Sequence, residues 1–249
     1  MSTPSVPTAC VLIIGNEILS GKTQDANLRF LGTELAKLGI RLEECRVIRD
    51  DLDAIVAHVN ECRAKFTYVF TTGGIGPTHD DITAEGVARA FGVELVVDPE
   101  AVVRLKHAGV QLNEARMKMA RVPAGASLID NPVSAAPGFR MDNVFVLAGI
   151  PAIARAMFAA AAPLLHGGAA IHSRSVDVFL KEGDLAEALE RIARAHDDVE
   201  IGSYPFARDG RFGANLVVRG ADEVKVEAVL REITEAMAAL GGEPRPPPQ

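Results

Sequence analysis

The sequence predicts an α/β protein: a mostly parallel β-sheet covered by helices on both faces, followed by a small α+β domain. Apolar runs of strand length alternate with stretches of helical periodicity over the first two-thirds of the chain, which implies parallel strands joined by right-handed crossovers. The first run, ACVLIIG at 9–15, is continuously apolar, as expected for a strand buried on both faces. After the glycine pair at 167–168 the order changes to strand, helix, strand, strand, helix. We therefore expect domains at 8–168 and 169–242, with a disordered tail at 243–249.

The elements of the first domain follow from the spacing of their apolar residues. Leu28, Leu31 and Leu35 recur at helical spacing and predict a helix over 27–38, which Gly39 would end. After 9–15, further strands are expected at 42–48, 67–72, 93–97 and 144–147. The other helices are expected at 53–64, 84–91, 99–108, 114–120 and 152–165.

The second domain is predicted from a shorter set of patterns. Its strands are expected at 173–180, 200–205 and 213–219, and its helices at 184–196 and 222–240. This order is typical of an antiparallel sheet. The tail GGEPRPPPQ cannot continue a helix, because proline lacks the backbone donor, so we expect it to be disordered.

Composition excludes several classes of protein. The chain has 249 residues, of which 48% are hydrophobic, and a net charge of -7. A packed core is expected, and no basic stretch offers a nucleic-acid footprint. No apolar run approaches the roughly 20 residues that cross a bilayer, and the N-terminal stretch lacks the features of a signal peptide. We expect a cytoplasmic protein without nucleic-acid or membrane partners. Three scattered cysteines argue against a disulfide framework or a thiolate zinc site.

The stretch TTGGIGPTHDD at 71–81 is the first candidate site. Gly73, Gly74 and Gly76 follow a buried strand, where glycine lets a ligand approach the backbone and exposed N–H groups hold an anion. Pro77 stiffens the loop. The spacing is neither that of a P-loop nor that of a Rossmann fingerprint. A tight strand-to-helix turn without a ligand explains the glycines equally well.

Asp80 and Asp81 close this loop with two adjacent carboxylates. Beside a phosphate, such a pair favours a divalent cation, which accepts oxygen ligands from protein and phosphate together. Asp81 is alternatively the cap of the helix that follows, or a general base. Capping explains one aspartate well and both poorly.

Further acidic and glycine residues follow the other strands. Gly15 and Glu17 lie in GNEILSG after the first strand, and Asp50 follows the second. Asn27 is either a ligand residue or the cap of the first helix. Carboxyl ends of parallel strands meet at one edge, so these residues are expected around one crevice. The loops NPVSAAPGF at 131–139 and AGIP at 148–151 would add walls to this crevice, or are ordinary turns.

Five ordered motifs together resemble one family. GNEIL, TTGGIGPTHDDIT, NEARMKMARVP, NPVSAAPGF and VLAGIP are similar to the MoaB/Mog-type molybdopterin-binding domain in its CinA-like branch, over about residues 9 to 165. The segments RSVDVF and IGSYPF are similar to the same subgroup, which includes the N-terminal region of eukaryotic FAD synthases. The resemblance implies a three-layer α/β/α sandwich, a homo-oligomer, and a site for molybdopterin or a related nucleotide.

The resemblance also implies roles for particular residues. The three loop glycines would cradle a phosphate with Thr78 alongside, while Asp81, Asp50 and Glu17 match functional acidic positions. The chain departs from the family where GNE replaces a threonine or aspartate before the glutamate, and where Ala148 replaces a loop proline. The deamidase and adenylyltransferase activities of longer relatives are not expected.

Three functions are weighed. The first is binding of a pterin phosphate or nucleotide. The second is metal-dependent cleavage of a pyrophosphate such as FAD or ADP-ribose, with Asp81, Asp50 and Glu17 as catalytic residues and Asp80 and Asp81 as metal ligands. The third is an inactive binding module. The sequence leaves open whether the protein is an enzyme.

Overall fold

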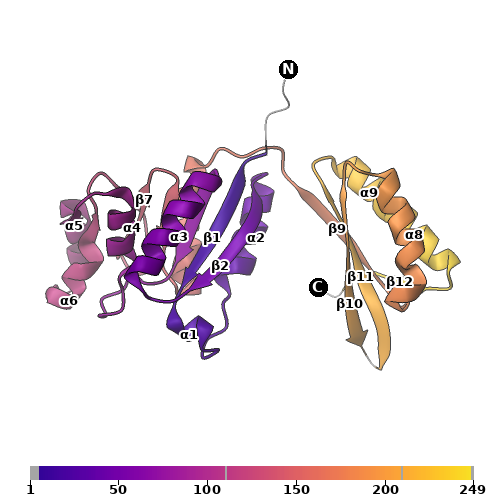
Figure 1. Ribbon diagram of the computed structural model, residues 1–249, viewed down its shortest axis with the longest axis horizontal. Coiled ribbons are helices and arrows are strands. Elements are labelled where there is room, and N and C mark those ends of the chain that lie inside the picture. The colour runs from indigo at the N-terminus through magenta and orange to yellow at the C-terminus, as the bar shows by residue number, and fades with distance from the viewer. Residues whose placement is uncertain (1–5, 110, 209, 248–249) are drawn as a thin grey trace, which may run out of the picture. The chain divides into compact units, whose positions relative to one another are not determined.

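A computed structural model of the chain describes residues 6–109, 111–208 and 210–247 (Figure 1). It contains two compact units, one comprising nearly all of the chain up to Gly168 and the other beginning at Ala169. Within the described residues, no helix is both long enough and apolar enough to cross a membrane.

The first unit is built on a six-stranded sheet in the order β2-β1-β3-β8-β7-β6. The strands β2, β1, β3 and β8 run parallel, and β7 and β6 are antiparallel to their neighbours. Their bounds are β1 Thr8–Ile14, β2 Arg41–Ile48, β3 Tyr68–Thr72, β6 Ser127–Ile129, β7 Gly138–Met141 and β8 Val144–Leu147. The sequence predicted all four parallel strands but neither β6 nor β7, whose three and four residues are too short to show periodicity.

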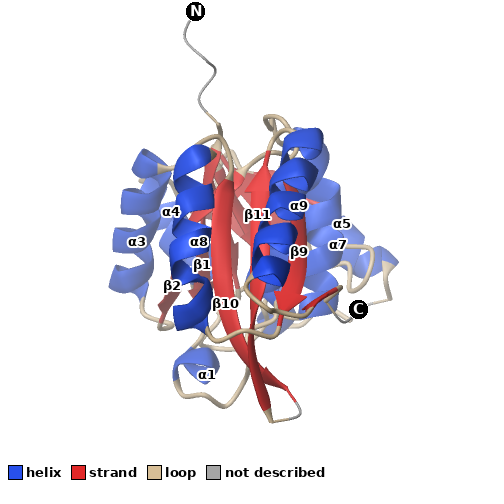
Figure 2. Ribbon diagram, turned by 90° about the vertical axis from the view of Figure 1, so that its right-hand side faces the viewer, coloured by secondary structure: helices blue, strands red, loops and turns tan. Residues whose placement is uncertain are grey.

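Helices cover both faces of this sheet. Their bounds are α2 Asn27–Lys37, α3 Leu52–Lys65, α4 Thr83–Phe91 and α7 Pro151–Ala161. On one face, Leu12 of β1 packs with Ile55 of α3 and Val87 of α4. On the other, Phe158 of α7 lies 5.6 Å from Phe30 of α2, between ring centroids, and 5.7 Å from Phe70 of β3. The predicted three-layer α/β/α sandwich is confirmed, and Figure 2 shows α3 and α4 on one side of β1 and α7 on the other.

Smaller elements complete the first unit. They are α1 Asn16–Leu19, β4 Leu95–Val97, α5 Pro99–His107, α6 Glu114–Met117, the 3-10 turns η1 Lys118–Ala120 and η2 Ala162–Leu164, and β5 Arg121–Pro123. The short strands β4 and β5 pair with each other in a separate antiparallel sheet. The sequence did not predict α1, because a single helical turn carries no periodicity.

The second unit has a four-stranded antiparallel sheet in the order β10-β11-β9-β12. Its elements are β9 His172–Val178, α8 Glu182–Ala195, β10 Glu200–Arg208, β11 Arg211–Gly220, α9 Glu223–Ala239 and β12 Pro244–Arg245. Both helices cover one face, where Val178 and Leu216 pack with Leu185 and Ile233. The predicted small α+β fold is confirmed.

The predicted tail at 243–249 differs from the structure where the structure describes it. Pro244 and Arg245 form β12 and pair with Val178 and Asp177 of β9. Proline is tolerated there because β12 is an edge strand, where one side of the backbone needs no partner. Residues 248–249 lie outside the described part of the chain.

Candidate functional site

A cavity of about 540 Å³ opens at the carboxyl ends of β1, β3 and β8. Its lining comprises Glu17, Thr23, Gly73, Gly74, Ile75, Gly76, Pro77, Asp81, Met119, Asn131, Ser134, Ala136, Ala148, Gly149, Ile150, Pro151, Ile153 and Met157. Of the residues predicted from sequence, Glu17, Gly73, Gly74, Gly76, Pro77 and Asp81 line the cavity, whereas Gly15, Asn27, Asp50, Thr78 and Asp80 do not.

The glycine loop is shaped by close backbone approaches. Gly73 has φ 102°, and a Cβ atom there would lie 2.1 Å from the carbonyl oxygen of Ile14 at the end of β1. At Gly74, with φ 68°, a Cβ would lie 2.2 Å from the hydroxyl of Thr83. That hydroxyl donates to the Gly73 carbonyl at 3.0 Å, and the Thr83 N–H donates to the Gly74 carbonyl at 3.0 Å. Thr83, which is fully buried, therefore fastens the loop to the start of α4.

The loop offers donors to an anion. Within the described residues, the backbone N–H groups of Gly74, Ile75 and Gly76 have no hydrogen-bond partner in the protein. The helices α4 and α7 begin beside the loop and the cavity, and neither Ile82 nor Ile150, their N-cap residues, supplies a capping side chain. Free N–H groups and helix N-termini both attract negative charge. The arrangement is suited to a phosphate or a carboxylate.

Asp81 closes the loop from its far end. One carboxylate oxygen accepts the N–H of Thr78 at 2.7 Å and also the Thr78 hydroxyl. A Cβ atom on Gly76 would lie 2.6 Å from the same oxygen. The alternative that Asp81 caps α4 is wrong, because Ile82 occupies the cap position and no side chain bonds there.

Lys118 holds the same loop from the outside. Its ammonium group donates to the carbonyl of Thr78 at 2.5 Å and to that of His79 at 3.3 Å. Together with Arg121 it lines a second, smaller space behind the glycine loop, of about 20 Å³, which is room for about one water molecule. The motif NEARMKMARVP contributed to the family resemblance, but no role was predicted for Lys118. The one feature that could have indicated its role is that Lys118 is a positively charged residue within a motif shared with the family.

A group of carboxylates lies at the same edge. Burial raises the pKa of the Asp50 carboxyl above its usual range. A hydrogen bond from the Asn16 N–H, at 2.8 Å, lowers this pKa, whereas the negative charges of Glu17 and Asp80 raise it. The Glu17 carboxylate sits against Gly15, where a Cβ atom would lie 2.5 Å from it. Glycine at that position therefore makes room for Glu17.

The predicted metal ligands are Asp80 and Asp81. Within the described part of the chain, no group of three or more His, Cys, Asp and Glu side chains is arranged to hold a metal ion. Asp81 is engaged with Thr78, and the Asp80 side chain is 57% exposed beside His79. The protein alone therefore supplies fewer than three such ligands within the described residues, and a cation shared with a bound phosphate stays a prediction.

Asn27 was expected either to cap α2 or to contact the ligand, but in the structure its side chain bonds to another loop. Asp25 is the residue that caps α2, since it accepts the N–H of Leu28 at 2.8 Å. The Asn27 side chain is 3% exposed and donates to the carbonyl of Gly149 at 2.8 Å. It thus ties the start of α2 to the loop after β8, which lines the cavity. Asn27 is therefore not the cap of α2, and its side chain does not line the cavity.

The remaining walls were not assigned from sequence. Asn131, 3% exposed, donates to the Ser134 hydroxyl and to the Ala136 carbonyl, both at 2.7 Å, and so shapes the loop at 131–136. Apart from the polar groups of the glycine loop, much of the lining is apolar, from Ile75, Met119, Ile150, Ile153 and Met157. Such a surface suits a flat ring.

Comparisons with known proteins agree with this architecture. The family model described as a probable molybdopterin binding domain matches residues 10–167, and that of the FAD synthase middle domain matches residues 170–241. A protein from Archaeoglobus fulgidus is 34% identical over 91% of this chain and 96% of its own length. A crystal structure of the protein CinA from Thermoplasma acidophilum is 35% identical, with a TM-score of 0.60, and covers 64% of this chain and 97% of that one.

Two longer relatives carry more specific names. A CinA-like protein from Gloeobacter violaceus is 31% identical over 95% of this chain, and a probable FAD synthase from Caenorhabditis elegans is 32% identical over 95%. This chain spans only 58% and 51% of their lengths, respectively. The matched domains, the identity and the shared fold show that the chain belongs to the molybdopterin-binding-domain family, among its CinA-like members.

Proposed function

We propose that this protein binds a small phosphorylated ligand, a pterin phosphate such as molybdopterin or a related nucleotide, in the cavity at the strand ends. The observation that carries this proposal is the run of three unpartnered N–H groups at Gly74, Ile75 and Gly76. These three residues are half-buried at the cavity, so their N–H groups are free to bond to a ligand there. A bound phosphate would satisfy all three beside the N-terminus of α4.

The apolar part of the lining favours a ligand with a ring. Ile150 is 61% exposed at the rim although it is a large hydrophobic residue. Ile75 and Met119 line the same cavity. A flat pterin or nucleobase would cover these side chains while its phosphate reached the glycine loop. Small-molecule sites usually combine an apolar lining with a few polar groups that orient the ligand.

Isothermal titration with molybdopterin, and separately with FAD and AMP, tests this proposal. Ile150→Asp should abolish binding, because it places a negative charge at the rim of an anion site. Val103→Asp on α5 is the matched control, since Val103 is 47% exposed and lies outside the cavity lining. Equal affinity in both variants, or no binding of any of these ligands by the unaltered protein, would overturn the proposal.

A second candidate function is hydrolysis of a dinucleotide pyrophosphate such as FAD or ADP-ribose. Its support is the raised pKa of Asp50 beside Glu17, because a carboxyl with a raised pKa is a better proton acceptor. Water would attack one phosphorus, the bridging P–O bond would break to release AMP and a second phosphate ester, and a carboxylate would take the proton. No step is assigned to a metal.

Release of AMP from FAD and ADP-ribose, with and without added Mg²⁺, tests this second function. Asp50→Asn should abolish turnover. Asp51→Asn is its control, because Asp51 accepts the N–H of Ala54 as the cap of α3 and asparagine caps a helix equally well. Binding without turnover would leave an inactive binding module. The family resemblance leads us to propose a cytoplasmic homo-oligomer as well, and sedimentation equilibrium would refute it by giving a monomer.

A further inference from the structure

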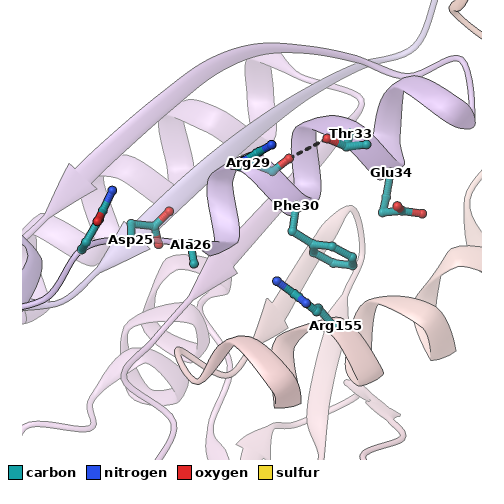
Figure 3. Close-up of a pocket in the computed structure, with 8 residues that line it drawn as sticks. Asp25, Ala26, Arg29, Phe30, Thr33, Glu34 and Arg155 are labelled. Carbon is teal, nitrogen blue, oxygen red and sulfur yellow. Dashed lines mark hydrogen bonds between the residues drawn. The ribbon is translucent and has the colours of Figure 1, made fainter. Parts of the chain in front are cut away.

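A separate hollow, of about 550 Å³, lies along one stripe of α2 where α7 packs beside it (Figure 3). Its lining residues are Gln24, Asp25, Ala26, Arg29, Phe30, Thr33, Glu34 and Arg155. None of them lines the cavity at the strand ends. Its volume is within the range of about 300 to 1,000 Å³ usual for small-molecule sites. The proposed function makes no use of this hollow.

Two arginines give the hollow its charge. Arg29 comes from α2 and Arg155 from α7, and neither forms an ion pair with a carboxylate of the described residues. Arg46, Arg89 and Arg104 of the same unit, by contrast, each lie within 2.6 Å of a glutamate oxygen. Two guanidinium groups without a carboxylate partner therefore line one hollow, in a protein with a net charge of -7, and are available to an anion from outside.

An aromatic ring lies between the helices at the same place. Phe30 is half-buried, and Phe158 packs edge-on against it with 5.6 Å between centroids. The guanidinium carbon of Arg155 is 5.5 Å from the centre of the Phe30 ring. Figure 3 shows Arg155 reaching from α7 toward this ring. The Phe30 ring is therefore held in place by its neighbours while part of it still faces the hollow.

The two acidic residues of the lining leave the middle of the hollow cationic. Figure 3 shows Asp25 and Glu34 at opposite ends of the stripe, with Phe30 and Arg155 between them. The Asp25 carboxylate is engaged with the N–H of Leu28 as the cap of α2. Neither acid separates the aromatic ring from Arg155. Thr33 and Gln24 add neutral polar groups to the rim.

We propose that this hollow is a second ligand site, which takes a nucleoside monophosphate. Guanidinium groups bind phosphate oxygens in a bidentate geometry, so Arg29 and Arg155 would hold the phosphate. A nucleobase stacks on aromatic rings and on guanidinium planes, so the base would lie against Phe30. An inorganic anion would contact only the arginines. A variant without the Phe30 ring should therefore affect nucleotide binding but not the binding of an inorganic anion.

The test is a titration of isotope-labelled protein with AMP, ribose 5-phosphate and inorganic phosphate, followed by NMR. AMP should shift the backbone amides of residues 24–34 and the side-chain resonance of Arg155. Arg29→Gln or Arg155→Gln should weaken AMP binding at these resonances by about tenfold, the loss expected for one charge-assisted pair. Arg191→Gln on α8 removes the same charge from another exposed arginine and should change nothing.

The variant Phe30→Leu distinguishes the contribution of the base to binding from that of the phosphate. It should weaken AMP binding about tenfold while leaving ribose 5-phosphate binding unchanged, because leucine removes the ring on which the base stacks. Shifts confined to the glycine loop, unchanged AMP affinity in both arginine variants, or equal affinity for AMP and inorganic phosphate would each overturn the proposal. Thermal unfolding and the amide spectrum of each variant establish that it is folded.

Discussion

The carboxylate of Asp81 reaches back along the chain to Thr78, whose backbone N–H it accepts at 2.7 Å and whose hydroxyl it also accepts. This contact closes the loop that follows β3 into a compact turn, with the Gly76 backbone packed against the same oxygen. The adjacent Asp80 is exposed and does not line the cavity. Two neighbouring aspartates thus lie in different environments, and one of them fixes the shape of the proposed phosphate loop.

Asp81→Ala should loosen this loop. The variant loses an acceptor for two donors of Thr78, and we expect ligand affinity to fall about tenfold while global stability falls by about 1 kcal/mol, because the donors become free to bond to water. Asp197→Ala removes an exposed carboxylate from the second unit; it is the control and should change both quantities little. Titration calorimetry and urea denaturation measure the two effects. Equal losses in both variants would contradict the role of Asp81.

Thr83→Val should destabilise the unit from the other end of the loop. Its hydroxyl is fully buried and donates to the Gly73 carbonyl at 3.0 Å. Valine has the same shape but leaves that buried carbonyl without this donor, which costs about 1–3 kcal/mol. Thr83→Ser keeps the hydroxyl and should retain the hydrogen bond. A urea unfolding series would contradict the prediction if valine proved no worse than serine.

The sequence indicated the location of the site because that location follows from topology. Parallel strands end at one edge, so the loops after β1 and β3 were expected to meet, and Gly73 does contact the carbonyl of Ile14. The contacts that shape the loops join distant residues without a local signature. Asn27 bonds to the carbonyl of Gly149, 122 positions away, and Lys118 bonds to that of Thr78, 40 positions away. Spacing and propensity carry no information about such pairs.

The missed elements have the same physical explanation. The strands β6 and β7 and the helix α1 contain only three or four residues each, fewer than any periodicity requires. The strand β12 begins with proline, and its pairing with β9 reflects tertiary context over local preference. Long apolar runs, by contrast, were predicted within one or two residues, as β1 shows.

Asp50 should make stability depend on pH. Its folded pKa is raised, first by burial and also by Glu17 and Asp80, so the folded state binds the proton more tightly than the unfolded chain. Its contribution is therefore favourable at low pH and is lost as pH rises from the ordinary aspartate pKa of about 3.9 through the raised value. Asp50→Asn removes this dependence. The stability of the variant relative to the unaltered protein should rise across that window, by a fraction of a kcal/mol because Asp50 is partly exposed.

Denaturant unfolding of both proteins at several pH values measures this difference. Asp51→Asn serves again as the control, because Asp51 caps α3 and is replaced by an equally good cap. A relative stability that fell with rising pH would show that the Asp50 pKa is depressed instead. A flat profile would show that Asp50 is fully solvated, and the proton-accepting role proposed for it would lose its support.

Lys118 should control the mobility of the loop rather than its fold. Its ammonium group bridges two successive carbonyls, those of Thr78 and His79. Lys118→Met retains the aliphatic stem but removes the donors. Amide hydrogen exchange at Thr78 and Asp81, whose N–H groups are hydrogen-bonded within the loop, should therefore accelerate about tenfold, as expected for the loss of about 1.4 kcal/mol of local stability. Lys118→Arg keeps the charge and donors and should recover part of the protection.

The variant Lys106→Met removes an exposed lysine from α5 and is the control for loss of charge. Exchange that accelerated equally in the methionine variants at 106 and 118 would assign the effect to net charge and not to the bridge.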